Sequence, residues 1–573
     1  SLRFLDPACG CGNFLVIAYR EVRELEIQVL KERFPLGQYE LLDVATLSLI
    51  DVDQFYGIEI NVSWARISEV ALWMMDHIMN NRLSAAFGKA FARIPLQKSP
   101  HIHCADALEM DWGDVLPPEL CSYILGNPPF VGQSFQSTIQ RGQMRRTIGG
   151  NGRGGSLDYV AAWFITAASY LRKGAARVGF VATNSITQGE QVAQLWPLLF
   201  RDQLEITFAH RTFEWESEAK GKAHVHCVIL GLARQELEPP KKRLFSYSNI
   251  RKDPTETAVQ TLSPYLLDAS RLKDRHLVVR ERNEPLCDVQ SMRMGCKIVD
   301  GGHFIFDELE REKFLRTEPQ SADFMRPLLG SKQYINGGKR WVLNLENVAP
   351  DILRAMPLIM ERISRVKEFR LKSKKDKTRE LALTPTRFEV RTVPSTPFIA
   401  IPEVSSERRD YVPIGWLSPP ITPSNLLHAL QNAEQWHFAM LTSAMHMSWL
   451  RHIGGRLKSD FRYSIGLVYN TFPWPEIDEN AKARLTLLAQ AVLDARASHP
   501  NATLADLYDP DVMPPNLRKA HRELDIAVDR LYRKEPFSSD RERAEHLFTL
   551  YEKLTSGMLA TINEKKKRAM SQP

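Results

Sequence analysis

The sequence predicts an α/β protein that begins with an open, mostly parallel sheet, continues into a mixed α+β region and ends in a helical segment. Short apolar runs at residues 2–6, 54–60 and 102–108 are separated by helical patterns, and strands that alternate with helices build a parallel sheet. Residues 290–480 instead show short strands with many Gly and Pro turns and two helices. From about residue 481 onward, Leu and Ala recur at helical spacing.

The first predicted strand ends in a turn of small residues that includes Gly10 and Gly12. A helical pattern starts near Phe14 and continues through Leu30. Glycine lets the backbone approach a ligand at a helix N-terminus, where unpaired N–H groups point outward. Because ligands bind at the carboxyl ends of the strands in an open α/β sheet, this turn is a candidate ligand site.

Two further strands end in carboxylates. Glu59 ends the second strand and is suited to hold two ribose hydroxyls, while Asp106 ends the third and is suited to an adenine amine. Either residue alone is better explained as a solvated strand end or a helix cap, and their order along the chain favours a nucleotide site. Glu59 lies 47 residues after Gly12, rather than the about 20 of a dinucleotide fold. Residues 31–53 are therefore expected to extend the first helix or to insert a second one.

The fourth strand end is the most informative, because Asn127, Pro128, Pro129 and Phe130 follow an apolar run at residues 122–125. An Asn oxygen and a backbone carbonyl that accept from an exocyclic NH2 group would localise its lone pair, which is otherwise delocalised into a base ring. The prolines remove two N–H donors and fix φ, so that a carbonyl can point into a pocket. The aromatic ring offers a face to an extruded base. Taken alone, the four residues can also be a simple turn.

These runs together resemble an amino-group DNA methyltransferase of the MmeI-like family, which comprises single-chain restriction–modification enzymes. The resemblance rests on Asp-Pro-Ala-Cys-Gly-Cys-Gly-Asn-Phe at residues 6–14 and Gly-Asn-Pro-Pro-Phe at residues 126–130. It implies a Rossmann-like class I methyltransferase sheet, S-adenosyl-L-methionine as cofactor and double-stranded DNA as substrate. Phe130 resembles the adenine-N6 enzymes, whereas cytosine-N4 enzymes more often begin the loop with Ser. Direct methyl transfer to adenine N6 in a short motif is expected, without a metal.

The resemblance also assigns roles to single residues. The implied catalytic residues are Asn127, Pro128, Pro129 and Phe130. The implied cofactor-binding residues are Asp6, Pro7, Ala8, Gly10, Gly12, Asn13, Phe14, Glu59, Ile60, Asp106, Ala107, Asn127 and Asp158. Asp158 has a plain alternative, because an acid in the first turn of a helix predicted from Ser156 to Leu171 would stabilise the helix dipole. Residues 131–155, rich in Gly, Gln, Ser and Arg, are predicted to form a flexible loop.

Residues 290–480 resemble the target-recognition domain of the same family, most specifically at residues 454–464 and 469–475. Residues 362–380 contain nine Lys/Arg and three Asp/Glu, a balance of 9 − 3 = +6 that would neutralise phosphates, although a solvated helix face is the commoner explanation. Three basic residues at 456, 458 and 462 would project on one side of a strand, where Arg can clamp guanine and an Asp can accept from cytosine. Phosphate contacts and core salt bridges compete with base readout for each of these residues. The candidate DNA contacts are Arg456, Lys458, Asp460, Arg462, Lys372, Lys374 and Lys375.

Composition sets broad limits on the class of protein. The chain has 573 residues, and 75 basic against 68 acidic residues give a net charge of +7, which is compatible with a polyanionic partner. Seven cysteines show no repeated metal spacing and indicate a reduced, cytoplasmic protein. No run has the length of a membrane span. We expect four segments: a methyltransferase domain at 1–245, a connector at 246–289, a target-recognition domain at 290–480 and a helical region with a basic tail at 481–573.

Family members carry an N-terminal nuclease with an Asp…Glu-x-Lys metal site, and this chain opens almost directly in the first strand. We therefore expect the nuclease region to be missing and the chain to be a monomer that methylates without cutting. Three alternatives remain open. They are cytosine-N4 methylation, protein-glutamine methylation, which the large recognition region argues against, and a catalytically inert DNA-binding fragment of a larger enzyme.

Overall fold

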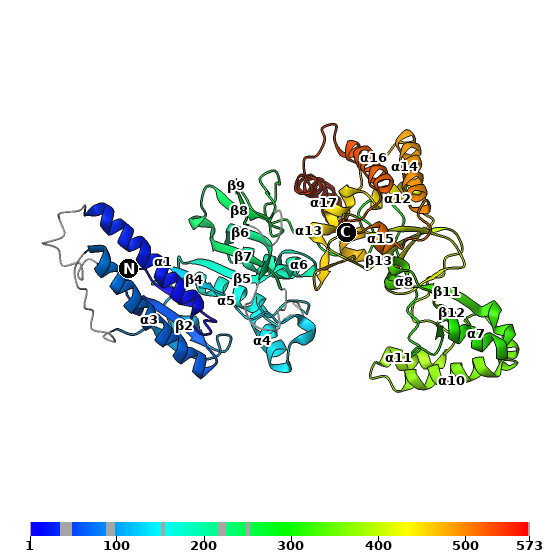
Figure 1. Cartoon of the computed structure of the whole chain (residues 1–573), viewed down its shortest axis with the longest axis horizontal. Helices are drawn as coiled ribbons and strands as arrows, with labels where there is room; N and C mark the ends of the chain where they lie inside the picture. The colour runs from blue at the N-terminus through cyan, green and yellow to red at the C-terminus, as the bar shows by residue number, and fades with distance from the viewer. Residues whose placement is uncertain are drawn as a thin grey trace. The chain divides into compact units, whose positions relative to one another are not determined.

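The computed structural model describes residues 2–34, 48–87, 98–150, 155–215, 225–247 and 253–570. The chain forms two compact units, Ser1–Val278 and Val279–Pro573 (Figure 1). Among the described residues, no helix combines the length and the apolar character needed to cross a membrane.

The first unit is built on a nine-stranded sheet with the order β3-β2-β1-β4-β5-β7-β6-β8-β9. The first five of these strands pair in parallel, while β7 is antiparallel to both of its neighbours. The strands are β1 (Phe4–Asp6), β2 (Phe55–Glu59), β3 (His101–Cys104), β4 (Tyr123–Gly126), β5 (Arg177–Thr183), β6 (Leu204–Trp215), β7 (Val225–Arg234), β8 (Lys242–Ser246) and β9 (Thr255–Val259). The order reverses between β1 and β4, and this switch point is where ligands bind in doubly wound sheets.

Five helices accompany this sheet in the part of the chain that the structure describes. They are α1 (Asn13–Arg33), α3 (Val62–Phe87), α4 (Thr138–Ile148), α5 (Ala161–Leu171) and α6 (Glu190–Arg201). Helices α1 and α3 pack side by side (Figure 1) and share a core with β1 and β2. In α1 the buried residues recur every three or four positions, the period of a helix with one buried face. Its buried Leu15 and Tyr19 join Phe4 and Phe55, whose rings stack at 4.7 Å.

The predicted α/β class is confirmed, and three local predictions need correction. The stretch 131–155, predicted as a flexible loop, contains helix α4, which begins at a capping box between Ser137 and Gln140. The helix predicted from Ser156 begins at Ala161 instead. Residues 255–259, expected in the connector, form edge strand β9 of the sheet. Helix α1 ends at Arg33, and most of the stretch in which a second helix was expected, residues 35–47, lies outside the described residues.

The second unit combines three small sheets with many helices. The sheets have the orders β10-β12-β11-β16, β15-β13-β17 and β14-β19-β18. Their strands are β10 (Ile305–Phe306), β11 (Met325–Leu329), β12 (Trp341–Leu343), β13 (Phe398–Pro402), β14 (Val404–Ser405), β15 (Gly415–Leu417), β16 (Thr422–Pro423), β17 (Leu427–Gln431), β18 (Gly455–Leu457) and β19 (Asp460–Arg462). The predicted mixture of short strands and turns is confirmed, but the described residues of this region contain more helices than the two expected.

The helices of this unit fall into two groups. Those within the mixed region are α7 (Glu308–Thr317), α8 (Ser331–Asn336), α9 (Pro350–Arg354), α10 (Pro357–Leu371), α11 (Asp376–Glu380), α12 (Gln435–Leu441) and α13 (Ala444–Ile453). The C-terminal helices are α14 (Glu479–Ala497), α15 (Leu504–Leu507), α16 (Pro515–Tyr532) and α17 (Asp540–Met570). The predicted C-terminal helical segment is therefore confirmed.

Candidate active site

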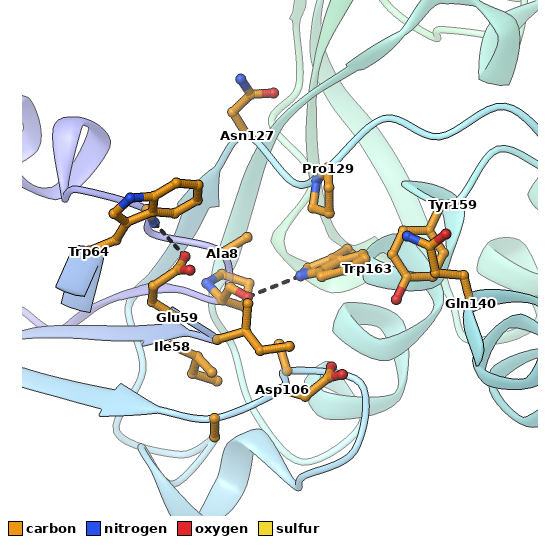
Figure 2. A pocket seen from close by; sticks show the side chains of 15 residues that line it. Ala8, Ile58, Glu59, Trp64, Asp106, Asn127, Pro129, Gln140, Tyr159 and Trp163 are labelled. Atoms are coloured by element: carbon orange, nitrogen blue, oxygen red, sulfur yellow. Dashed lines mark hydrogen bonds between the residues drawn. The ribbon is translucent and has the colours of Figure 1, made fainter. Parts of the chain in front are cut away.

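A cavity of about 410 Å³ lies at the carboxyl ends of β1, β2, β3 and β4 (Figure 2), a volume within the usual range of small-molecule sites. The predicted residues that line it are Pro7, Ala8, Gly10, Glu59, Ile60, Asp106, Ala107, Asn127 and Pro129. The other lining residues are Ile58, Trp64, Ala105, Gln140, Tyr159 and Trp163. Four strand ends therefore meet around one space, although the first and the last of them, Asp6 and Gly126, lie more than one hundred positions apart in the chain.

The glycine turn after β1 requires backbone conformations that other residues rarely adopt. Gly10 and Gly12 have φ angles of +55° and +84°, in the left-handed region that glycine enters without steric cost. A Cβ atom at Gly12 would also lie 2.4 Å from the Oγ atom of Ser68 in α3. The turn therefore brings the start of α1 close to α3 and leaves its backbone along the cavity.

Glu59 is buried at the end of β2 and ties this turn to the start of α3. Its Oε2 accepts from the Gly10 N–H at 3.0 Å and its Oε1 accepts from the Asn61 N–H at 2.8 Å. Each carboxylate oxygen has a second lone pair, which remains for a ligand hydroxyl. These two hydrogen bonds from backbone N–H groups hold the carboxylate at the cavity wall. Figure 2 shows Glu59 at this wall.

Asp6 lies beneath the turn and does not line the cavity. Burial raises the pKa of its carboxyl to about 7, with a further contribution from the negative charge of Glu59. Its Oδ1 accepts from the Ala8 N–H at 3.0 Å. Gly126 passes directly over it with a φ of +154°, and a Cβ at that position would lie 2.4 Å from Asp6 Oδ1. Asp6 therefore shapes the turn and sets how closely β4 approaches β1.

The loop after β4 places an unsatisfied acceptor beside the cavity. The Oδ1 atom of Asn127 is buried and has no hydrogen-bond partner among the described residues. A buried polar atom without a partner costs free energy, roughly 1–3 kcal/mol, unless a ligand satisfies it. Pro128 is buried, Pro129 is exposed and Phe130 is half-buried. The loop therefore presents an acceptor and an aromatic ring in neighbouring positions.

Asp158 holds the segment that follows this loop. Its Oδ1 accepts from the backbone N–H groups of Val131 and Val160, at 3.1 and 3.2 Å. Burial raises the pKa of its carboxyl, while these hydrogen bonds act in the opposite direction. The residue is not among those that line the cavity, and its contacts fix the position of Phe130 through the neighbouring backbone.

Aromatic residues complete the cavity, and the sequence analysis did not assign them. Trp163 donates its indole N–H to the Pro7 carbonyl at 3.1 Å, and Tyr159 meets it edge-to-face with ring centroids 5.3 Å apart. The sequence offered one signal, because residues four apart share a face of the helix that was predicted from Ser156, although Tyr159 precedes α5 in the structure. Trp64 is half-exposed near the start of α3. Within the described residues no group of three or more His, Cys, Asp or Glu side chains is arranged to hold a metal ion.

The candidate DNA contacts near residue 460 lie on a hairpin rather than on a single strand. Strands β18 and β19 pair antiparallel, with Arg456 opposite Phe461 and Gly455 opposite Arg462. Because side chains alternate between faces, Arg456 and Arg462 point to opposite sides, and the expectation that they project together is wrong. Arg456 stacks on the Phe461 ring at 4.0 Å, and Arg462 pairs with Glu403 at 3.1 Å.

Two of the hairpin candidates lie near its tip. Lys458 is exposed in the turn with a φ of +57°, and Asp460 is half-buried where β19 begins. Burial lowers the pKa of Arg456 to about 10. Arg456, half-buried against a ring, and Arg462, paired with Glu403, are both engaged within the fold, whereas Lys458 is exposed in the turn.

The lysine candidates lie between α10 and α11. Lys372, Lys374 and Lys375 are exposed. Two arginines of the same basic stretch serve the fold instead: Arg370 donates to five backbone carbonyls, and Arg362 lies 4.0 Å from the Phe306 ring centroid. The three lysines are exposed, as are Arg365, Lys367, Lys377 and Arg379 of the same stretch. We refer to Lys372, Lys374 and Lys375 as the lysine segment.

A parallel half-sheet with a cavity at its switch point is the arrangement of an open α/β protein of the doubly wound class. Three domain models of one family match the chain: the MmeI DNA-methyltransferase domain at residues 1–246, the MmeI target recognition domain at 273–476 and the MmeI C-terminal domain at 477–559. The chain belongs to the MmeI family, and the predicted resemblance is confirmed.

Two relatives are similar to the chain over most of its length. The Type IIL restriction-modification enzyme MmeI, solved in complex with DNA, is 45% identical with a TM-score of 0.85, and the match covers 97% of this chain and 73% of that one. DNA methyltransferase A of Bacillus subtilis (strain 168) is 38% identical over 558 residues, or 97% of this chain. The chain spans 61% of the length of that curated relative.

Proposed function

We propose that this chain is a site-specific DNA methyltransferase of a restriction–modification system, which transfers a methyl group from S-adenosyl-L-methionine to adenine N6 in a short motif of double-stranded DNA. The observation that carries the proposal is the buried, unpartnered Oδ1 of Asn127 at a cavity that Glu59 and Asp106 also line. Among the described residues this oxygen lacks a hydrogen-bond donor, and the amino group of a substrate base would supply one. We further propose that the protein acts as a monomer in the cytoplasm.

The residues around the cavity fit a nucleoside cofactor. When bound, S-adenosyl-L-methionine supplies a methyl group activated by its sulfonium charge. The free lone pairs of Glu59 suit the two ribose hydroxyls, and Asp106 suits the adenine amine. The turn through Ala8 and Gly10 leaves backbone beside the cavity, at the N-terminus of α1.

The loop after β4 would hold the acceptor base. Asn127 Oδ1 and the Pro128 carbonyl would accept from the amino group, which directs its lone pair away from the ring and toward the methyl donor. Phe130 would stack on the base once it leaves the duplex, offsetting an unstacking cost of a few kcal/mol. Alignment of the two reactants then supplies much of the rate acceleration.

Kinetic long-read sequencing tests this function directly. Plasmid DNA from a methylation-deficient bacterium that expresses the chain should carry N6-methyladenine at one recurring motif. Asn127→Ala should remove the marks because it removes the acceptor, whereas Asn501→Ala, a change at an exposed residue of the second unit, should leave them. Marks on cytosine would identify a cytosine-N4 enzyme, and unmarked DNA from a folded protein would contradict the proposal.

A further inference from the structure

Helix α4 inserts one buried side chain, Gln143, beside the cavity. Gln143 is 2% exposed and bridges two residues that line the cavity. Its Nε2 donates to Asp106 Oδ2 at 2.8 Å, and its Oε1 accepts from the Tyr159 hydroxyl at 2.5 Å. A carboxylate only accepts hydrogen bonds, and an amide has one donating and one accepting end. The side chain therefore satisfies both neighbours in one orientation.

The carboxylate of Asp106, which only accepts, fixes which end of the Gln143 amide faces which neighbour, and the Tyr159 hydroxyl supplies the donor for the other end. Burial, together with the negative charges of Asp106 and Glu109, raises the pKa of Tyr159 to about 12. The hydroxyl therefore keeps its proton near neutral pH and donates it to Gln143 Oε1. The NH2 end of Gln143 is then directed at Asp106.

The carboxylate of Asp106 is consequently held at both oxygens. Oδ1 accepts from the Leu108 N–H at 3.0 Å, and Oδ2 accepts from Gln143. One helical turn further along α4, Arg146 forms an ion pair with Glu109. Two adjacent turns of α4 thus contact the segment that carries Asp106, one through Gln143 and the next through Arg146. These contacts hold the carboxylate so that its remaining lone pairs point in a defined direction.

We propose that Gln143 is a positioning residue that makes the cavity selective for a purine with an exocyclic amino group. The inference rests on the proposed function, because it takes Asp106 as the acceptor for the amine of the cofactor. A 6-amino group donates to a fixed carboxylate, whereas a 6-oxo group places a second acceptor against it. A site built to accept a hydrogen bond discriminates strongly against a ligand that lacks the donor.

Calorimetric titration with two thioether nucleosides measures this selectivity without any methyl transfer. The probes are S-adenosylhomocysteine, which has the 6-amino group, and S-inosylhomocysteine, which has a 6-oxo group. Wild type should bind the amino ligand at least about tenfold more tightly. Gln143→Leu should weaken the amino ligand by about tenfold and leave the oxo ligand nearly unchanged, because Asp106 loses the donor that orients it.

Two further variants keep the test decisive. Arg145→Ala changes an exposed residue of the same helix and should retain the wild-type ratio. Tyr159→Phe removes the hydroxyl that anchors the Oε1 end of Gln143 and should reduce the ratio even if Gln143→Leu does not fold. A folded Gln143→Leu with an unchanged ratio, or a wild type without preference, would overturn the positioning role alone. A wild type that binds neither ligand would overturn the proposed cofactor as well.

Discussion

Asp6 illustrates how a single buried carboxyl can be both structural and sensitive to pH. Its side chain lies between the glycine turn and Gly126, and it leaves no room for a Cβ atom at residue 126. Burial raises its pKa from an ordinary 3.8 to about 7, so the folded protein keeps a proton that the unfolded chain loses at lower pH. A raised folded-state pKa gives stability that is fully present below pH 3.8 and is lost as pH rises to about 7.

We therefore predict that Asp6→Asn becomes more stable relative to wild type as pH rises from 5 to 8. An amide cannot ionise, so the variant avoids the cost of a buried charge. The part of this cost that appears between pH 5 and the folded-state pKa of about 7 approaches roughly 3 kcal/mol, at about 1.4 kcal/mol per pH unit. Urea unfolding of both proteins at pH 5, 6.5 and 8 measures the difference. Asp525, whose pKa burial raises to about 6, is common to both proteins and cancels. A difference that does not change with pH would contradict the assignment.

At the scale of elements, basic residues of similar appearance in the sequence serve different purposes. Arg370 in α10 is buried and joins neighbouring segments through backbone carbonyls, and Arg456 in β18 stacks on Phe461. The lysine segment between α10 and α11 is solvent-facing. Exposed lysines contact phosphates without reading sequence, and each contact releases counterions from the DNA.

We predict that the combined change Lys372→Gln, Lys374→Gln and Lys375→Gln weakens DNA binding and its dependence on salt. The slope of log K against log salt should become shallower by up to about 3, at roughly 0.9 per phosphate contact. Fluorescence anisotropy of a labelled duplex between 50 and 200 mM salt measures both quantities.

A matched control removes the same charge from exposed positions on α16. It is the combined change Lys519→Gln, Arg522→Gln and Arg530→Gln, and it should leave the slope unchanged. An equal loss in both triple variants would show that net charge, rather than a contact at the lysine segment, governs the affinity.

At the scale of the whole molecule, each compact unit has a hydrophobic core of its own. Phe4, Leu15 and Phe55 belong to the core of the first unit, and Phe306 and Val342 belong to that of the second. All residues that line the cavity belong to the first unit, and the lysine segment belongs to the second. Ligand binding stabilises the cooperative unit that contains its site.

We predict that differential scanning calorimetry resolves two unfolding transitions and that S-adenosylhomocysteine raises only one of them. At about one hundred times the dissociation constant, the ligand should add about 2.7 kcal/mol to the stability of the first unit. Gln143→Leu should reduce this shift at the same ligand concentration. A single transition that the ligand raises would show instead that the two units unfold as one.

The sequence by itself determined where the strands of the first unit end and many of the residues that line the cavity at those ends. Gly10, Glu59, Asp106 and Asn127 were predictable because each follows an apolar run, and parallel strands bring their carboxyl ends to one edge. Local chemistry was sufficient for these residues. The family resemblance and the α/β class followed from the same short runs.

Only the tertiary structure decided which partners the remaining side chains have. Gln143 lies 37 residues from Asp106, on a helix within a stretch that the sequence predicts as a loop. The sequence left DNA contact and a role in the core both open for Arg456, and strand pairing places Phe461 opposite it. The physical reason is the same in both cases. Residue type and spacing specify local conformation, whereas burial and hydrogen-bond partners depend on which distant segments pack against each other.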